Sequence, residues 1–247
     1  MKKFLLCVFT LAVIPLLAAA YWEPVISWGI NPNTRGTTPE PPAGGAKLLS
    51  EYNGIFVGNT DGKKVYFTFD LGYEAGYTAE VLDILKEHSI KGIFFLCGNY
   101  LKETELIGRM LAEGHEIGNH TDRHKDLPSL SEEGVKKDIL TFAENYNARY
   151  SGKPIKFFRP PQGRFSKKVL SIADGQGLKT TLWSIAIVDW GKKPIDAAVN
   201  AKKITSRLHP GAIILFHITN SGTPEMLKLL IPQIAEKGYT VGSPAEL

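Results

Sequence analysis

The sequence contains little cysteine, with only Cys7 and Cys97 among its 247 residues. Residues 1–20 combine two lysines, an apolar run and three closing alanines, which predicts a secretory signal peptide. Cys97 is then the single cysteine of an exported chain, so an internal disulfide is excluded. Its place in the apolar run GIFFLCG predicts a core residue. An uncleaved membrane anchor is the alternative for residues 1–20, although the run is short for a bilayer.

Long hydrophobic runs and an excess of one charge are also lacking. After residue 20, no segment is apolar over the length that a membrane span requires. The formal net charge is +4 and falls to +2 without Lys2 and Lys3. So small a charge favours no nucleic-acid partner.

Two sequence motifs of common enzyme classes are missing as well. No glycine-rich phosphate loop follows the first strand-like run, which argues against a nucleotide-binding sheet. No G-x-S-x-G elbow occurs, which argues against a serine hydrolase. The composition, 43% hydrophobic and 22% charged, suits a single folded domain.

What the sequence does contain is a regular alternation of elements. Residues 21–50 are rich in Pro, Gly, Thr and Asn and predict an extended N-terminal arm, followed by a domain over residues 51–247. In that domain, β-rich apolar runs, one of them KTTLWSIAIVDW over residues 179–190, alternate about seven times with amphipathic helices, one of them from about 131 to 150. Such alternation predicts an α/β fold with a parallel sheet, and the continuous apolar strands predict burial on both faces. A (β/α) barrel with about seven parallel strands is the expected fold.

Polar side chains follow the apolar strands at the ends where barrel chemistry gathers. Five strands carry such a group: Asp70 after VYFTF, His120 after HEIGN, Arg159 after KFF, Asp189 after SIAIV and His217 after AIILF. We expect the five to converge on one rim.

His120 and His124 are spaced i, i+4, which would place both rings on one side of a helical turn and within reach of one ion such as zinc. A polar turn is the alternative for this spacing. Opposite them, Asp70 is a candidate base and His217 a candidate acid. Arg159 is expected to hold Asp70 in a forked ion pair, and Asp189 to orient His217. These parts suit metal-assisted hydrolysis of an amide or ester.

The motifs TFDLG, HTDRH, RPPQG, VDW and IILFH, in this order between Thr68 and His217, resemble those of the polysaccharide deacetylases with a NodB-homology domain, carbohydrate esterase family four. The resemblance implies a distorted (β/α) barrel that removes acetyl groups from N-acetylated sugars. It also implies Asp70 as base, His217 as acid, Arg159 and Asp189 as their partners, and His120 and His124 as metal ligands.

The resemblance also implies substrate contacts. A backbone N–H at Gln162, next to Gly163, would hold the oxyanion, while Leu215 and Trp190 would line the acetyl pocket. Tyr73 and Glu74, beside the base, are further candidate substrate contacts. Capping of the following helix is the alternative for Glu74.

One position departs from the family pattern. Leu71 stands where the family has a second aspartate that binds the metal, so a divalent ion, with zinc expected, would rest on two imidazoles. FDLGYE with NHTxxH resembles the muramic-acid deacetylases of sporulating bacteria, whose first motif also lacks that aspartate. This implies an exported cell-wall enzyme that removes the acetyl group of N-acetylmuramic acid in peptidoglycan, on the way to the δ-lactam of spore cortex. A monomer is expected.

Two alternatives stay open from the sequence. The incomplete metal set is compatible with a non-catalytic glycan-binding module, although such a module needs no acid, base and partners. A deacetylase of chitin or xylan would share the same fold and signal peptide.

Overall fold

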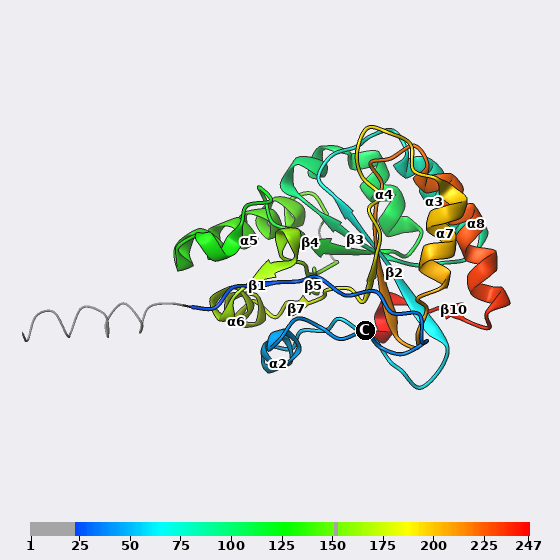
Figure 1. Ribbon diagram of the computed structural model, residues 1–247. Helices are drawn as coiled ribbons and strands as arrows, with labels where there is room; N and C mark the ends of the chain where they lie inside the picture. The colour runs from blue at the N-terminus through cyan, green and yellow to red at the C-terminus, as the bar shows by residue number, and fades with distance from the viewer. Residues whose placement is uncertain (1–22, 151–152) are drawn as a thin grey trace, which may run out of the picture.

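The computed structural model describes residues 23–150 and 153–247, so the expected signal peptide of residues 1–20 lies outside the described residues. Strands and helices alternate along the chain (Figure 1). The main-sheet strands are β2 (Lys64–Leu71), β3 (Ile93–Leu96), β4 (Glu116–Asn119), β5 (Phe157–Phe158), β7 (Lys179–Thr180), β8 (Ile185–Ala186), β9 (Ala212–His217) and β10 (Thr240–Val241). The helices are α2 (Gly45–Glu51), α3 (Thr78–Glu87), α4 (Thr104–Ala112), α5 (Glu132–Asn147), α6 (Lys167–Gly175), α7 (Ala197–Thr205) and α8 (Thr223–Glu236).

The main sheet is parallel and curled. Its strands follow the order β7-β5-β4-β3-β2-β9-β8, and β10 adds to the start of β2. The edge strands β7 and β8 are consecutive in the chain, separated only by residues 181–184. The sheet therefore curls until both edges meet in one extended segment. This confirms the expected distorted (β/α) barrel with about seven parallel strands.

The segment that joins the two edges corrects one expectation. A single strand was expected over residues 179–190, but the structure has two short strands there. β7 pairs with β5, and β8 pairs with β9 on the other edge. One straight pleated strand cannot follow both edges, so the segment bends between them. At the bend, the Leu182 N–H donates to the Ile55 carbonyl at 2.8 Å.

Alternation along β2 separates a helix-facing core from the barrel interior. Val65, Phe67, Phe69 and Leu71 lie in one apolar cluster with residues of α3, α4, α7 and α8, which gather on one side of the sheet in Figure 1. The Phe69 ring stacks on Phe94, with centroids 4.7 Å apart. The intervening side chains, Asp70 among them, face the interior instead. The core cluster thus fixes the strand that carries the candidate base.

The N-terminal arm packs along the domain. Strand β1 (Ile26–Ser27) pairs antiparallel with β6 (Arg164–Phe165), and the Trp28 indole N–H donates to the Trp183 carbonyl at 2.9 Å. The expected arm of residues 21–50 is not extended throughout, because α2 begins at Gly45. The sequence GAKLLSE contains good helix formers, and burial of Leu49 against the neighbouring core stabilises the turn.

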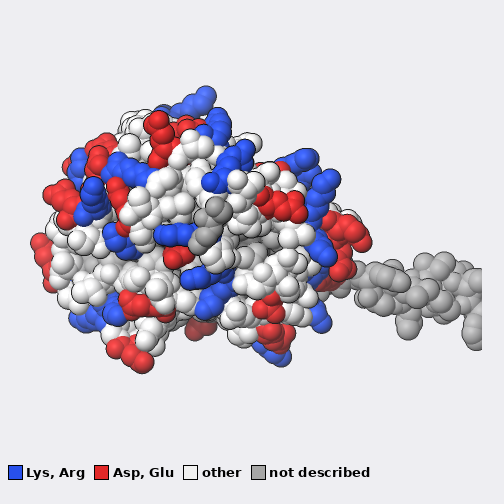
Figure 2. All heavy atoms as spheres, turned by 180° about the vertical axis from the view of Figure 1, so that it is seen from behind, with Lys and Arg blue, Asp and Glu red and all other residues white. Residues whose placement is uncertain are grey.

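The distribution of charged side chains on the surface agrees with the small net charge. Figure 2 shows Lys and Arg interspersed with Asp and Glu over the visible face, with no large area of one sign. Within residues 23–150 and 153–247, no helix has the length and apolarity to cross a membrane.

Loss of the Trp28 side chain is expected to loosen the arm. Trp28 is buried and packs edge-on against Phe56 at 5.1 Å. Replacing Trp28 by Ala should lower the free energy of unfolding by about 3 kcal/mol, measured by denaturant titration. The matched control is Val25→Ala in the same arm, where the side chain is exposed. Equal unfolding midpoints for both variants would contradict the packed arm.

Candidate functional site

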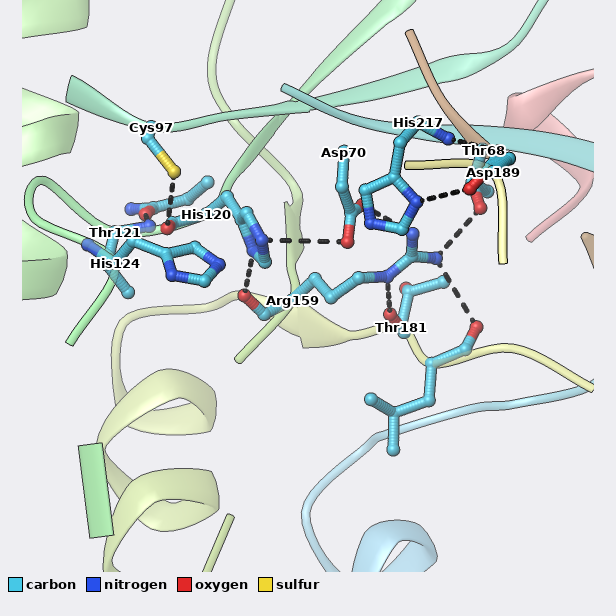
Figure 3. A network of polar contacts seen from close by, with 12 residues as sticks. Thr68, Asp70, Cys97, His120, Thr121, His124, Arg159, Thr181, Asp189 and His217 are labelled. Carbon is cyan, nitrogen blue, oxygen red and sulfur yellow. Dashed lines mark hydrogen bonds and ion pairs between the residues drawn. The ribbon is translucent and has the colours of Figure 1, made fainter. Parts of the chain in front are cut away.

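The five strand-end residues do converge on one rim (Figure 3). Asp70 and His217 are paired neighbours at the ends of β2 and β9. His120 and Arg159 follow β4 and β5 directly, and Asp189 follows β8 by three residues. The arrangement expected from the positions after apolar strands is therefore present.

Arg159 is fully buried inside the barrel. Its Nη1 donates to Asp70 Oδ1 at 2.7 Å, whereas its Nη2 donates to Thr68 Oγ1 at 2.9 Å. Its Nε donates to the Thr181 carbonyl at 2.8 Å, and the guanidinium lies over the Phe95 ring at 4.1 Å. The expected forked ion pair with Asp70 is thus wrong, because the other two guanidinium nitrogens donate to the Thr68 hydroxyl and the Thr181 carbonyl instead.

The single hydrogen bond leaves the second oxygen of Asp70 turned toward His120, with Oδ2 3.5 Å from Nε2. Burial alone would raise the pKa of Asp70, but nearby positive charge, most of all that of Arg159, outweighs it, so the pKa is lowered. Asp70 is therefore ionised at neutral pH, with one oxygen not bound by Arg159. That oxygen has the form that a proton acceptor requires.

The two imidazoles come together by a tight bend, so the expected helical turn is wrong. Residues 120–124 are not helical, and both Thr121 and His124 adopt left-handed φ, at 68° and 53°. Asn119 Oδ1 accepts from the Thr121 N–H at 2.8 Å, and Thr121 Oγ1 accepts from the His124 N–H at 2.9 Å. These short polar side chains stabilise the bend and bring the His120 and His124 ring centroids to 4.9 Å.

Both histidines fit a metal ion. His120 Nδ1 donates to the Arg159 carbonyl at 2.8 Å, since a carbonyl can only accept, and the lone pair then lies on Nε2. Burial lowers the pKa of His120 to about 4, and partial burial lowers that of His124, so both rings are neutral at pH 7. Neutral imidazole is the form that binds zinc.

The described residues do not complete a ligand set, however. In the described ranges, no group of three or more His, Cys, Asp and Glu side chains is placed to hold a metal ion. Leu71, at the position of the family's second aspartate, is fully buried in the helix-facing core. The structure thus supplies two imidazoles for an ion and no third dedicated ligand.

Asp189 holds His217 from two sides. Its Oδ1 lies 2.8 Å from His217 Nδ1, and its Oδ2 accepts from the His217 backbone N–H at 2.7 Å. Burial alone would lower the pKa of His217, but the hydrogen bond and charge of Asp189 outweigh it and raise the pKa. Asp189 thereby fixes the ring through Nδ1, and Nε2 is left on the edge away from Asp189. The expected orienting role matches this geometry.

The expected pocket walls differ in exposure. Trp190 is exposed and its ring meets that of His217 edge-on at 4.9 Å. Leu215 is buried on β9, opposite Thr68. Tyr73 is exposed beyond the end of β2. Trp190 and Tyr73 are therefore accessible to a substrate, and Leu215 belongs to the layer beneath it.

Gln162 and Gly163 occupy the turn Pro161–Gly163 after β5. Gln162 is exposed and left-handed, with φ 60°, a conformation that costs a non-glycine residue about 1 kcal/mol. Gly163 is buried instead, and an added Cβ would lie 2.7 Å from the Trp183 ring. Gly163 was expected to contact substrate, but it packs beneath the arm, where its carbonyl accepts from the Trp28 N–H at 2.9 Å.

The Glu74 carboxylate forms hydrogen bonds at the start of α3. Its carboxylate accepts hydrogen bonds from the Gly76 N–H, the Thr78 hydroxyl and, at 2.6 Å, the Tyr100 hydroxyl. These contacts fix the start of α3, as the alternative of a helix cap expects, and contact of Glu74 with a substrate stays a prediction. The sequence signal for the capping role was the position of Glu74, an acidic residue shortly before Thr78, where α3 begins.

Sequence reasoning missed Thr68. Its hydroxyl accepts from Arg159 and donates to the Ile214 carbonyl at 2.8 Å, which ties β2 and β9 to the buried guanidinium. Thr68 faces the same side of β2 as Asp70, so alternation along TFD was a usable signal.

Comparison with known proteins agrees with this geometry. The family model described as polysaccharide deacetylase matches residues 57–181. The peptidoglycan-N-acetylmuramic acid deacetylase PdaA of Bacillus subtilis is 36% identical over 228 residues, covering 88% of this chain and 84% of that protein. The chain belongs to the polysaccharide deacetylase family. It is accordingly a hydrolase of N-acetyl amide bonds.

Three further similarities concern structure and substrate class. The solved structure of B. subtilis PdaA, a family 4 carbohydrate esterase, has a TM-score of 0.84 over 90% of this chain and 96% of that one, at 35% identity. A peptidoglycan-N-acetylglucosamine deacetylase of Bacillus cereus is 34% identical, covering 77% and 70% of the two chains. A family 4 pseudoenzyme of Bacillus anthracis has a TM-score of 0.72 at 31% identity, covering 78% and 68%.

Replacing Asp189 by Asn should lower the pKa of His217, because burial then acts without the opposing charge. In the wild type, the raised pKa contributes stability that is present below the ordinary value of about 6.5 and is lost as pH rises through the raised value. The variant should lose this pH dependence. Histidine NMR titration measures the pKa, with Asp174→Asn on the surface as control. An unchanged His217 titration would contradict the coupling.

Proposed function

We propose that this protein removes the N-acetyl group of muramic-acid residues in peptidoglycan, releasing acetate and a free amine. The observation that carries the proposal is the pairing of Asp70 and His217 on adjacent strands at one rim, where Arg159 lowers the pKa of the carboxyl and Asp189 raises the pKa of the imidazole. Hydrolysis of an amide needs a base for the water and an acid for the leaving nitrogen.

The proton steps follow from these two groups. Asp70, through the oxygen that Arg159 leaves uncovered, takes a proton from a water as that water attacks the acetamide carbonyl carbon. His217 then donates its Nε2 proton to the sugar nitrogen while the carbon–nitrogen bond breaks. Arg159 keeps Asp70 ionised and fixed, and Asp189 keeps His217 protonated and oriented.

A divalent ion on His120 and His124, with zinc favoured by the imidazole ligands, supplies Lewis acidity to the water and the acetamide when bound. The backbone N–H of Gln162 is our candidate donor to the developing oxyanion, in keeping with the left-handed strain found there. Trp190 and Tyr73, both exposed beside the acid and base strands, are candidate substrate contacts.

The substrate and location follow from the relatives and from the sequence resemblance. The named B. subtilis relative acts on N-acetylmuramic acid, and it matches this chain over nearly its whole length. Action on peptidoglycan supports a location outside the cytoplasm, at the cell wall, as does the signal peptide expected over residues 1–20. Its expected monomeric state and role in spore cortex stay predictions.

Replacing Asp70 by Asn should abolish turnover, with a loss of at least about 100-fold, because the amide cannot accept the proton. The amide oxygen can still accept the Arg159 hydrogen bond, so the fold should persist, as circular dichroism would show. Acetate release from peptidoglycan glycan strands measures the activity. The control is Asp174→Asn, an exposed carboxylate far along α6. Wild-type turnover by the Asp70 variant would refute the role of the base.

Replacing His124 by Ala should lower metal content and activity together. The remaining imidazole, His120, cannot hold an ion alone with comparable strength. Elemental analysis of the purified protein beside the acetate assay measures both, with the exposed His88→Ala as control. Full activity of the wild type in strong chelator would show that no ion takes part.

A non-catalytic glycan-binding protein is the second candidate, favoured by the missing third ligand and by the similarity to a pseudoenzyme. Acetate release separates the two, since a binder releases none at any zinc concentration. Parallel assays on chitin oligomers and acetylated xylan test the substrate, and a preference for either polymer over peptidoglycan strands would overturn the assignment.

A further inference from the structure

A groove of about 390 Å³ lies beside the candidate site, between the N-terminal arm and the segment that contains β8. Its walls come from the arm between Trp28 and Pro39, from residues 183–188 together with Trp190, and from one side of α7. Trp190 lines this groove and also contacts His217, with the two ring centroids 4.9 Å apart. The groove therefore adjoins, through Trp190, the rim where the reaction is proposed.

The groove is positively charged. Lys203 and Arg207 line it from α7, and none of its lining residues is an aspartate or glutamate. In the described part of the chain, neither cation forms an ion pair with a carboxylate. Two cations without acidic partners in one concave wall are complementary to an anionic ligand.

The other walls suit a sugar rather than a peptide. The indoles of Trp183 and Trp190 and the side chain of Ile187 supply apolar surface, and Asn200 supplies an amide. An extended peptide would need free backbone groups along β8. Arg207 already donates to the Ala186 carbonyl at 3.2 Å, which occupies part of that edge.

From these contacts we propose that the groove binds an acidic sugar of the same glycan strand, with its carboxylate facing Lys203 and Arg207. Trp190 lies four residues after Ala186, a separation of at most about 13 Å, which is enough to place the next acidic sugar, one N-acetylglucosamine beyond the reacting N-acetylmuramic acid, in the groove. The groove then selects carboxylated peptidoglycan strands over neutral glycans. This inference rests on the proposed function, because it assumes that the strand is held at the same rim.

Lys203→Met is the informative substitution, and Lys202→Met is its matched control. Both lysines are exposed in the last turn of α7 and interact alike with the helix dipole. Lys202 lines a different surface with Gln233 and Glu236, so only Lys203 faces the groove. Any effect specific to Lys203 therefore reports on the groove.

Binding is measured by calorimetry on the full chain carrying Asp70→Asn, which prevents turnover. The ligands are a peptide-free tetrasaccharide of alternating N-acetylglucosamine and N-acetylmuramic acid, the same tetrasaccharide bearing peptide stems, and neutral chitotetraose. We expect the peptide-free acidic ligand to bind more tightly than chitotetraose, with a preference that shrinks as salt rises. Lys203→Met should weaken binding of the peptide-free acidic ligand about threefold and leave binding of chitotetraose unchanged, as expected for the loss of one exposed charge contact.

Three results would overturn the proposal: no effect of Lys203→Met, an equal effect on acidic and neutral ligands, or an equal effect of Lys202→Met. Tighter, Lys203-dependent binding of the stem-bearing ligand would make the peptide the occupant and would also overturn it. Failure of the proposed function is seen separately, as absent acetate release by the protein with native Asp70 while the Lys203-dependent binding persists.

Discussion

The buried ion pair between Arg159 and Asp70 is the interaction on which the site depends. A guanidinium without solvent exposure needs every donor satisfied, because an uncompensated buried charge costs several kcal/mol. Here β2 supplies a carboxylate and a hydroxyl, while the chain after β7 supplies carbonyls. Satisfying Arg159 therefore fixes the relative positions of three strands. The same contacts fix Asp70, so the base is positioned by a requirement of folding.

The single contact with Asp70 has a chemical consequence. A forked pair would engage both carboxylate oxygens with the guanidinium and leave neither oxygen free of it. In this structure Thr68 and the Thr181 carbonyl take the other donors, and Asp70 Oδ2 is left on the side of His120. The arginine thus lowers the pKa of Asp70 without covering the oxygen that the proposed proton transfer needs. An acceptor with a lowered pKa is a weaker base, which makes the Lewis acidity of a bound ion valuable.

Much of the fold and the rim was predictable from the sequence, because strand ends can be read from apolar runs followed by polar residues. Asp70, His120, Arg159, Asp189 and His217 all lie where the parallel sheet implies. What the sequence did not reveal depends on contacts between distant segments. The bend at His120–His124 needs the side chain of Asn119, and the use of Glu74 depends on Tyr100, 26 residues later. The split between β7 and β8 follows from barrel closure, which no local pattern encodes.

The missing aspartate at position 71 bears on catalysis more than on folding. Leucine at that position packs with α3 and its neighbours, so it adds apolar burial where the family places a charge. The fold alone does not decide between enzyme and binder, since a related pseudoenzyme has a similar fold. The arrangement around His217 does bear on it. Asp189 is buried without solvent exposure and directs both oxygens at His217, an arrangement with a desolvation cost that glycan binding does not require. An oriented imidazole with a raised pKa beside a carboxylate with a lowered pKa is useful chiefly for moving protons, and this favours hydrolysis.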